Sequence, residues 1–169
     1  MNTTKTINIG SRGSKLALWQ ANYTIAQLEA IGISSNLTII KTKGDKIQHL
    51  SFDKIEGKGS MKDLPTESPE GLIITAVSYR ENPADLLLIH PDSIAEDQIL
   101  SFKKGAIVGT SSARRKSQIL DIRNDIEIKD IRGNVPTRIN KLRSGDFDAI
   151  LLAAAGIERL ELDLSDLKV

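Results

Sequence analysis

The sequence predicts an α/β fold with mostly parallel sheets, because strand and helix signals alternate along its 169 residues. A second observation supports this fold class. Three apolar runs each lead into a short turn of Gly, Ser, Thr or Asn, and an arginine lies within or shortly after that turn, at residues 7–14, 106–115 and 128–138. Junctions in which a strand turns directly into a helix are the repeating unit of a parallel sheet.

The first half of the chain begins with a predicted strand over residues 7–10, followed by a helix. Ser14 is suited to cap that helix, which runs to about Ile31 and is closed by Gly32. Trp19 lies on the helix, where we expect it to pack in the core or in a groove. Residues 37–41 are rich in β-formers and predict a second strand.

The middle of the chain carries weaker signals. Residues 42–59 are polar and contain glycine, which predicts a mobile loop. The apolar run 72–78 predicts a buried strand, residues 81–83 a turn or hinge, and residues 86–89 another strand. We place a domain boundary near Pro83, where one α/β unit ends and the next begins.

The second half alternates more cleanly. The predicted strands are residues 106–109, 126–131 and 148–153, and the predicted helices are residues 112–122, 136–143 and, opened by Gly156, 157–160. Proline at the start of the second of these helices is tolerated there.

The composition excludes several classes of function. The net charge is only +1, whereas nucleic-acid binders usually show a strong basic excess. The absence of cysteine excludes disulfides, thiolate metal sites and a cysteine-linked cofactor. No apolar run approaches membrane-spanning length, and the first six residues do not form a secretory signal. We therefore expect a cytoplasmic monomer that binds neither nucleic acid nor membranes.

The junctions themselves predict anion binding. A helix start offers unpaired backbone N–H groups, and Thr110, Ser111 and Ser112 add hydroxyl donors beside Arg114 and Arg115. A capped helix with two solvated arginines remains the alternative.

The junction that contains Arg132 and Arg138 is similar. Because consecutive strand–helix units open on the same edge of a parallel sheet, we expect both junctions to form one surface for carboxylates or phosphates. Three such junctions in one small protein suggest a ligand with several negative charges.

The other residues that could carry chemistry give weaker indications of function. Lys62 and Asp63 precede a proline. The pair forms either a solvated turn or a site in which the Asp63 carboxylate acts on a cationic nitrogen. His49 and His90 show no metal-ligand spacing, so we expect no metal site. Neither a GxGxxG fingerprint nor a phosphate-binding lysine loop occurs, which argues against dinucleotides and nucleoside triphosphates.

Several longer motifs resemble one family. They are residues 9–20 (IGSRGSKLALWQ), 42–46 (TKGDK), 58–59 (KG), 61–65 (MKDLP), 80–85 (RENPAD), 109–115 (GTSSARR), 131–138 (IRGNVPTR) and 152–156 (LAAAG). In order and in sequence they resemble porphobilinogen deaminase, also called hydroxymethylbilane synthase.

The resemblance implies a transferase of tetrapyrrole and haem biosynthesis that joins four porphobilinogen molecules into hydroxymethylbilane and releases ammonia. It implies two α/β domains like those of periplasmic binding proteins and a dipyrromethane cofactor held by a cysteine. Asp63 would be the catalytic carboxylate. Pyrrole carboxylates would be held by Arg12, Ser14, Lys62, Thr110, Ser111, Ser112, Arg114, Arg115, Arg132 and Arg138.

Two departures from the family pattern lead us to expect an inactive chain. Residues 59–61 join segments that a helix and a core strand separate in the family, so we expect an incomplete domain 1 (1–84) with exposed apolar surface beside domain 2 (85–169). The cofactor-carrying third domain is expected to be absent, and no cysteine can form the thioether. A non-catalytic polycarboxylate-binding module and a partial chain that needs a complementing fragment remain the alternatives.

Overall fold

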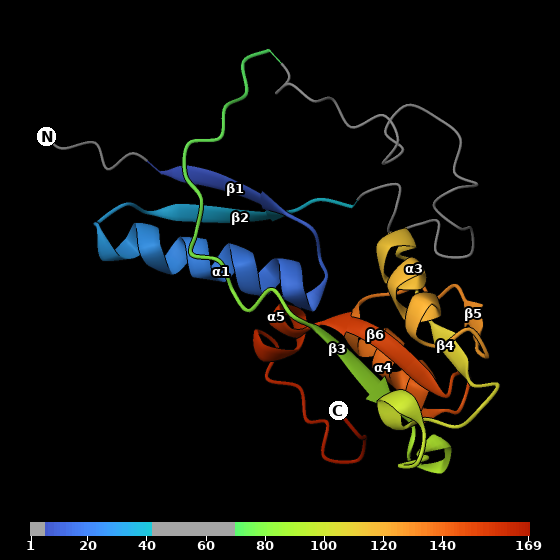
Figure 1. Cartoon of the computed structure of the whole chain (residues 1–169). Coiled ribbons are helices and arrows are strands. Elements are labelled where there is room, and N and C mark those ends of the chain that lie inside the picture. Colours follow the sequence, from blue (N-terminus) through green and yellow to red (C-terminus); the bar gives the residue numbers. More distant parts are fainter. Residues whose placement is uncertain (1–5, 42–69) are drawn as a thin grey trace, which may run out of the picture.

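The computed structural model describes residues 6–41 and 70–169, which contain two α/β units (Figure 1). The first consists of β1 (Ile7–Ser11), α1 (Lys15–Ala30) and β2 (Ser35–Ile39). The second consists of β3 (Asp85–Ile89), β4 (Ile107–Gly109), α3 (Ala113–Ile122), β5 (Glu127–Lys129), α4 (Val135–Arg143), β6 (Ala149–Ala153) and α5 (Ala154–Glu158), with short 3-10 turns at Pro91–Ser93 and Ile99–Ser101.

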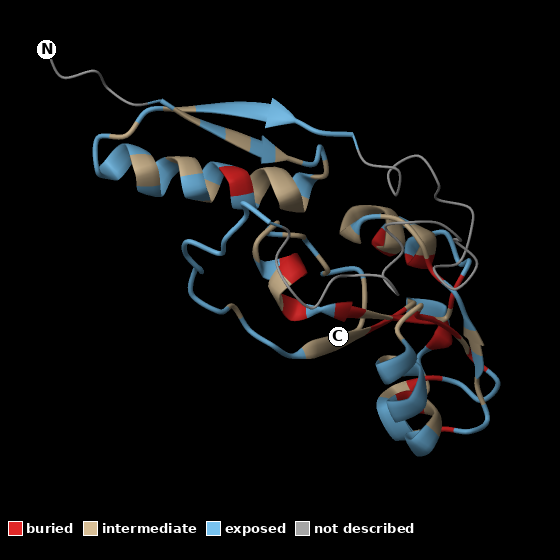
Figure 2. Ribbon diagram, turned by 90° about the horizontal axis from the view of Figure 1, so that it is seen from above, coloured by how far each residue is buried: buried red, intermediate tan, exposed pale blue. Residues whose placement is uncertain are grey.

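The first unit is a two-stranded parallel sheet with one helix. β1 pairs with β2 from Ile7 opposite Ser35 to Ser11 opposite Ile39. Two strands with one helix bury little surface, and Ala21 is the only buried residue of α1 (Figure 2). The predicted strand 7–10 is confirmed, and the strand expected over residues 37–41 begins and ends two residues earlier.

The ends of α1 follow the predicted capping residues. The Ser14 hydroxyl accepts a hydrogen bond from the backbone N–H of Ala17 at 3.3 Å, which satisfies one of the free donors of the first turn. Gly32 has φ +77°, a conformation that favours glycine and ends helices. The expected helix from Ser14 to about Ile31 is therefore confirmed.

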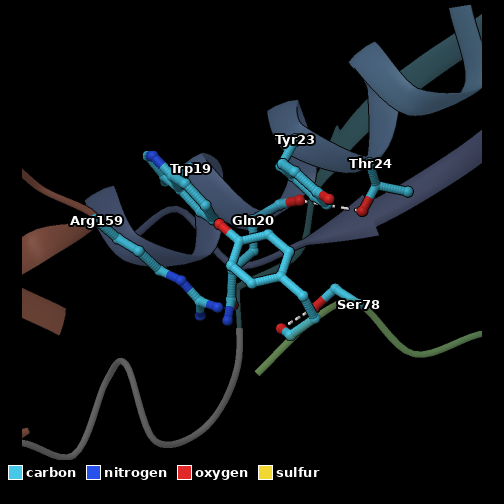
Figure 3. Close-up of a pocket in the computed structure, with 7 residues that line it drawn as sticks. Trp19, Gln20, Tyr23, Thr24, Ser78 and Arg159 are labelled. Atoms are coloured by element: carbon cyan, nitrogen blue, oxygen red, sulfur yellow. Dashed lines mark hydrogen bonds between the residues drawn. The ribbon is translucent and has the colours of Figure 1, made fainter. Parts of the chain in front are cut away.

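The outer face of α1 packs against the end of α5. The rings of Trp19 and Tyr23 stack with centroids 5.7 Å apart, and the Arg159 guanidinium lies 5.0 Å from the centre of the Trp19 ring (Figure 3). Trp19 is thus half-buried in the contact between the two units, as a packing residue.

The prediction of a strand over residues 72–78 is wrong. These residues form no strand and are exposed, with Ile73 81% and Val77 85% accessible to solvent. An apolar run becomes a strand only when a sheet edge accepts its backbone hydrogen bonds. Among the described residues no strand pairs with it. The exposed apolar surface expected of an incomplete first domain is therefore present on this segment.

The second unit is a four-stranded sheet in the order β3-β6-β4-β5. β4 runs parallel to both β5 and β6, and β3 is antiparallel to β6. The α/β class with mostly parallel strands is therefore confirmed. The division into domains at residue 84 stays a prediction, and the loop expected over residues 42–59 lies outside the described residues.

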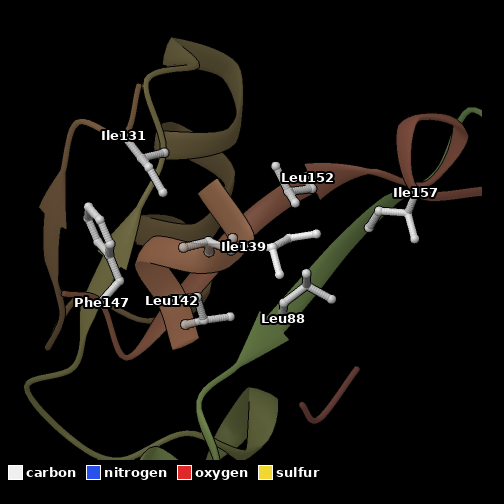
Figure 4. Close-up of a cluster of buried hydrophobic side chains, with 8 residues drawn as sticks. Leu88, Ile131, Ile139, Leu142, Phe147, Leu152 and Ile157 are labelled. Carbon is white, nitrogen blue, oxygen red and sulfur yellow. The ribbon is translucent and has the colours of Figure 1, made fainter. Parts of the chain in front are cut away.

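Two apolar clusters, on opposite faces of this sheet, form the core. Neighbouring residues of β6 alternate between them, since Ile150 and Leu152 join one cluster and Ala149 the other. The larger cluster lies under α4 and α5 (Figure 4) and consists of Leu88, Ile131, Ile139, Leu142, Phe147, Ile150, Leu152 and Ile157. The smaller one includes Ile119 of α3 together with Ile89, Phe102, Ala106, Val108 and Ala149. Helices therefore cover both faces, which leaves the strand ends for a site.

The last predicted helix begins three residues too late. We expected Gly156 to open a helix over residues 157–160, but α5 begins at Ala154 and contains Gly156. A Cβ at Gly156 would lie 3.3 Å from Val135 Cγ2 and 3.9 Å from Leu16 Cδ2. The glycine serves close packing of α5 against α4 and α1, which local sequence does not reveal.

Candidate functional site

Two of the predicted junctions meet at one edge of the second sheet. α3 and α4 start beyond the carboxyl ends of the adjacent parallel strands β4 and β5. The Ser111 hydroxyl joins them directly, since it donates to the Ile131 carbonyl at 3.0 Å and accepts from the Ile131 N–H at 3.1 Å. The expectation that both junctions share one sheet edge is confirmed. We call this surface the arginine edge, and it consists of Thr110, Ser111, Ser112, Arg114, Arg115, Arg132 and Arg138.

The hydroxyls of the arginine edge make local hydrogen bonds. Thr110 is buried and its hydroxyl accepts from the Ser112 N–H at 3.2 Å. Ser112 caps α3 by accepting from the Arg115 N–H at 3.4 Å. These contacts fix the turn that precedes α3. A role of the three hydroxyls as ligand donors stays a prediction.

Arg114 and Arg115 bind a carboxylate of the chain itself. Arg115 Nη2 donates to one oxygen of Asp85 at 2.6 Å, and Arg114 Nη2 donates to the other at 2.8 Å. Arg115 Nη1 also donates to the Leu151 carbonyl at 3.2 Å. The hydrogen bond from Arg115, assisted by Arg114, lowers the pKa of Asp85 against the opposing effect of burial. Two arginines expected to hold ligand carboxylates are therefore already paired.

Asp85 is the site residue that sequence reasoning missed. It is the first residue of β3, paired in the sheet with Ala153 at the end of β6. β3 is antiparallel, so its beginning meets the carboxyl ends of the parallel strands. Antiparallel pairing of the edge strand was not predictable from local pattern, and no spacing signal links Asp85 to an arginine 30 residues later.

Arg132 and Arg138 bring further positive charge to the same edge. Arg138 Nε donates to the Gly133 carbonyl at 2.9 Å, which draws the side chain back over the turn. Burial, and then the positive charges of Arg115 and Arg132, lower the pKa of Arg138. Three guanidinium groups from α3, the β5–α4 turn and α4 thus act on one another. An anion at this edge would relieve that repulsion.

The remaining predicted site residues lie in the first unit or outside the described residues. Arg12 is exposed in the β1–α1 turn, and Ser14 caps α1. The first turn of α1 lies beside α5, as the 3.9 Å approach of Leu16 to Gly156 shows. Lys62, Asp63 and His49 lie outside the described residues.

The described parts of the chain contain neither a group of three possible metal ligands nor a helix that could span a membrane. Within residues 6–41 and 70–169, no three His, Asp or Glu side chains gather as metal ligands would. His90 instead accepts a hydrogen bond from the Asp92 N–H at 3.2 Å in a 3-10 turn. Over the same ranges, no helix has the length and apolar character needed to cross a bilayer.

Comparison with solved structures gives only distant similarity. An ancestral arginine-binding protein bound to arginine aligns with a TM-score of 0.47 and 13% identity, over 96% of this chain and 77% of that chain. A mutant of ArgBP from T. maritima aligns with a TM-score of 0.45 and 11% identity, over 97% and 75%. These values are too low to carry an argument about fold or ligand.

Sequence comparison is far more specific. The chain is 47% identical to the porphobilinogen deaminase of a Nitratiruptor species, over 91% of this chain and 55% of the relative. It is 46% identical to that of Sulfurimonas denitrificans, over 94% and 56%. The chain thus spans about half the length of the curated relatives it matches.

The alignments also show an internal gap. They extend over 174 and 180 positions, more than the 169 residues of this chain, so the relatives carry residues that are absent here. The family model described as "Porphobilinogen deaminase, dipyromethane cofactor binding domain" matches in two pieces, residues 7–61 and 59–168, which meet where we expected a missing segment. Together the two pieces cover nearly the whole sequence, and the chain belongs to the porphobilinogen deaminase family.

Proposed function

We propose that this chain binds the carboxylates of a pyrrole oligomer at the arginine edge, without itself completing the reaction of its family. That reaction is the conversion of porphobilinogen to hydroxymethylbilane in tetrapyrrole biosynthesis, and we place it in the cytoplasm. The observation that carries the proposal is the gathering of Arg115, Arg132 and Arg138 at the starts of α3 and α4, on one edge of the sheet. Burial, and then the charges of Arg115 and Arg132, lower the pKa of Arg138 there. A concentration of like charge is stabilised by a counterion, and a polycarboxylate supplies several at once.

The geometry favours a polycarboxylate over a nucleic acid. The net charge of the whole chain is +1, whereas nucleic-acid binders usually carry a strong basic excess. Arg115 is engaged within the chain through both of its terminal nitrogens, and its Nε is buried. Arg132 and Arg138 are therefore the arginines that we expect to meet the paired oxygens of a ligand carboxylate.

The family's dipyrromethane cofactor fits this chain only in part. The arginine edge provides hydrogen-bond donors for the carboxylates of this cofactor, mainly from Arg132 and Arg138. Arg12 and Ser14, which lie in the first unit, would add further donors. The sequence contains no cysteine, so no residue here can form the thioether that anchors the group. When bound, dipyrromethane supplies the primer to which pyrroles are added. This chain's own residues would hold and orient its carboxylates.

The catalytic role that the resemblance assigns to Asp63 depends on a rigid surrounding. Gly59 and Ser60 stand where the resemblance implies a core strand, and they lie with Asp63 outside the described residues. An electrostatic role requires a pre-organised carboxylate. We therefore expect binding to depend on Arg132 and Arg138 and not on Asp63.

Calorimetric titration with a dipyrromethane that carries acetate and propionate groups tests the proposal. Arg132→Ala is expected to weaken binding about tenfold, as loss of one charge-assisted contact does, whereas Asp63→Ala leaves it unchanged. Lys104→Ala, an exposed cation outside the arginine edge, is the matched control for net charge. Absence of binding by the unmodified chain, or equal losses in Asp63→Ala and Arg132→Ala, would contradict the proposal.

A second candidate is a partial chain that requires a complementing fragment. The two-piece family match and the alignments longer than the chain favour it. A peptide with the residues that the Nitratiruptor relative has at the break would then bind and raise the affinity for the dipyrromethane. If the affinity is the same with and without this peptide, the candidate is wrong.

A further inference from the structure

The segment before β3 carries an apolar run that no described strand pairs with. Residues 70–80 are all exposed (Figure 2). Ile73, Ile74 and Val77 are 81%, 79% and 85% accessible to solvent, more than any other large apolar side chain in the described residues. No backbone–backbone hydrogen bond joins residues 72–78 to another described residue. Within the described chain this run therefore resembles an edge strand without a sheet, which is a template for pairing with another chain.

The composition of the run favours pairing with an identical segment. It reads LIITAVSY over residues 72–79 and contains no charged residue, no proline and no glycine. Short uncharged segments rich in β-formers are those that pair between copies of one chain. In an extended strand, Ile73 and Val77 share one face and Ile74 lies on the other. Both faces therefore offer apolar side chains to an opposing strand.

The charges that flank the run select one arrangement of two copies. Glu70 precedes the run and Arg80 follows it, and both side chains are exposed. When two copies lie antiparallel with Thr75 opposite Thr75, each Glu70 lies opposite an Arg80, which is a favourable cross-strand pair. A register shifted by one residue loses this pair, and a parallel arrangement in register places like charges opposite each other. The run is therefore complementary to itself in one antiparallel register.

We propose that residues 72–78 form an antiparallel β-pair with the same residues of a second copy of this chain. The two copies are then related by a two-fold axis through Thr75, and Ile73 of each copy lies opposite Val77 of the other. The sequence led us to expect a monomer with this run buried, and its exposure is the reason for the different proposal. Two strands alone are marginally stable in water, so the dimer is weak and forms at high protein concentration. The proposal does not depend on a ligand at the arginine edge.

Disulfide cross-linking tests the register, because the chain has no cysteine of its own. Directly opposite residues have Cα atoms about 4.5–5.5 Å apart, which a disulfide can span. Thr75→Cys is therefore expected to give a covalent dimer under a mild thiol oxidant. Ile73→Cys and Val77→Cys are the matched controls, because neither residue lies opposite its own copy. Each control should remain monomeric alone, whereas an equimolar mixture of the two should cross-link.

Charge exchange tests the flanking pairs independently. In sedimentation experiments at low salt, Glu70→Lys places a cation opposite Arg80 at both ends of the pair and should raise the dissociation constant of the dimer about tenfold. Arg80→Glu should have the same effect. The double variant with both substitutions keeps the net charge of the parent chain and should restore its affinity. A mixture of the two single variants should also recover it, as a mixed dimer.

Three outcomes would overturn the proposal. The first is a parent chain that stays monomeric up to about 1 mM. The second is cross-linking of Ile73→Cys alone as readily as Thr75→Cys, which would show that the run pairs in another register or with another strand. The third is a double charge variant whose affinity is no higher than that of Glu70→Lys.

Discussion

Replacing Asp85 by asparagine is expected to destabilise the second unit, because Asp85 is the carboxylate on which Arg114 and Arg115 converge. The substitution keeps the shape of the side chain and removes its charge. Arg115 then loses its hydrogen bond of 2.6 Å to an ionised partner while its side chain stays only 15% exposed. A buried cation without a counterion is the main source of the cost.

The size of the expected loss of stability follows from how far the side chains of Asp85 and Arg115 are buried. Asp85 is 22% exposed and Arg115 15%, whereas Arg114 is 61% exposed and contributes little. Exposed ion pairs stabilise by about 0–1 kcal/mol, and removing one partner of a fully buried pair costs about 3–5 kcal/mol. Since this pair lies between those limits, Asp85→Asn should lower the free energy of unfolding by roughly 1–3 kcal/mol at neutral pH.

The effect should also depend on pH. The Arg115 hydrogen bond lowers the pKa of Asp85 in the folded protein, so the stabilisation is complete above the pKa of an unfolded aspartate, about 3.9, and is lost as the pH falls through the lower folded pKa. The difference between the parent chain and Asp85→Asn is thus full at pH 7 and shrinks below about pH 4.

Urea unfolding followed by circular dichroism at pH 7 and pH 3 measures both effects. Asp92→Asn is the matched control, because that side chain is 90% exposed and its only ion-pair contact among the described residues is with His90 at 3.8 Å. The reasoning is refuted if Asp85→Asn and Asp92→Asn are equally stable at pH 7. It is also refuted if the loss at pH 7 persists undiminished at pH 3.

Three further outcomes are expected. Purified chain incubated with porphobilinogen should form no uroporphyrin above a heat-killed control, because no cysteine can anchor the primer, and turnover would contradict this. Gly133→Ala should destabilise more than Gly145→Ala in urea, because both glycines have positive φ but only Gly133 would place a Cβ 2.6 Å from Thr137; equal losses would contradict the packing argument. The Asp125 carboxyl should titrate by NMR with a pKa of about 2, because its hydrogen bond with Arg123 lowers it, and an ordinary value near 3.9 would show that this pair does not form.

Local sequence predicted the elements whose boundaries depend on their own residues. Ser14 caps the helix that follows, as the sequence predicted, and Ser112 also caps its helix, as short polar side chains at helix starts do. The α/β class and the shared edge of the two junctions followed from the alternation of strands and helices. These features depend on the order of the elements along the chain, which the sequence states directly.

The features that the sequence analysis predicted wrongly or missed depend on tertiary contacts. The run 72–78 is as apolar as a buried strand, but whether it pairs depends on a partner strand elsewhere in the chain. Gly156 reads as a helix opener, and only the approach of Val135 and Leu16 explains its place inside α5. Asp85 carries no local signal of its role, because its arginine partners become neighbours only through antiparallel pairing of β3. Sequence-based reasoning therefore identified the arginines of the edge without their internal counterion.

The most direct test of the account is an NMR titration of the labelled chain with the dipyrromethane polycarboxylate. Binding at the arginine edge predicts that the largest shifts occur at the backbone amides of Ser111, Ser112 and Gly133 and at the side-chain Nε–H of Arg138, and that Arg132→Ala reduces them. The amide of Ile39, at the end of β2 in the first unit, is expected to stay in place. Saturable shifts confined to the first unit, or no saturable shifts at the starts of α3 and α4, would contradict the account.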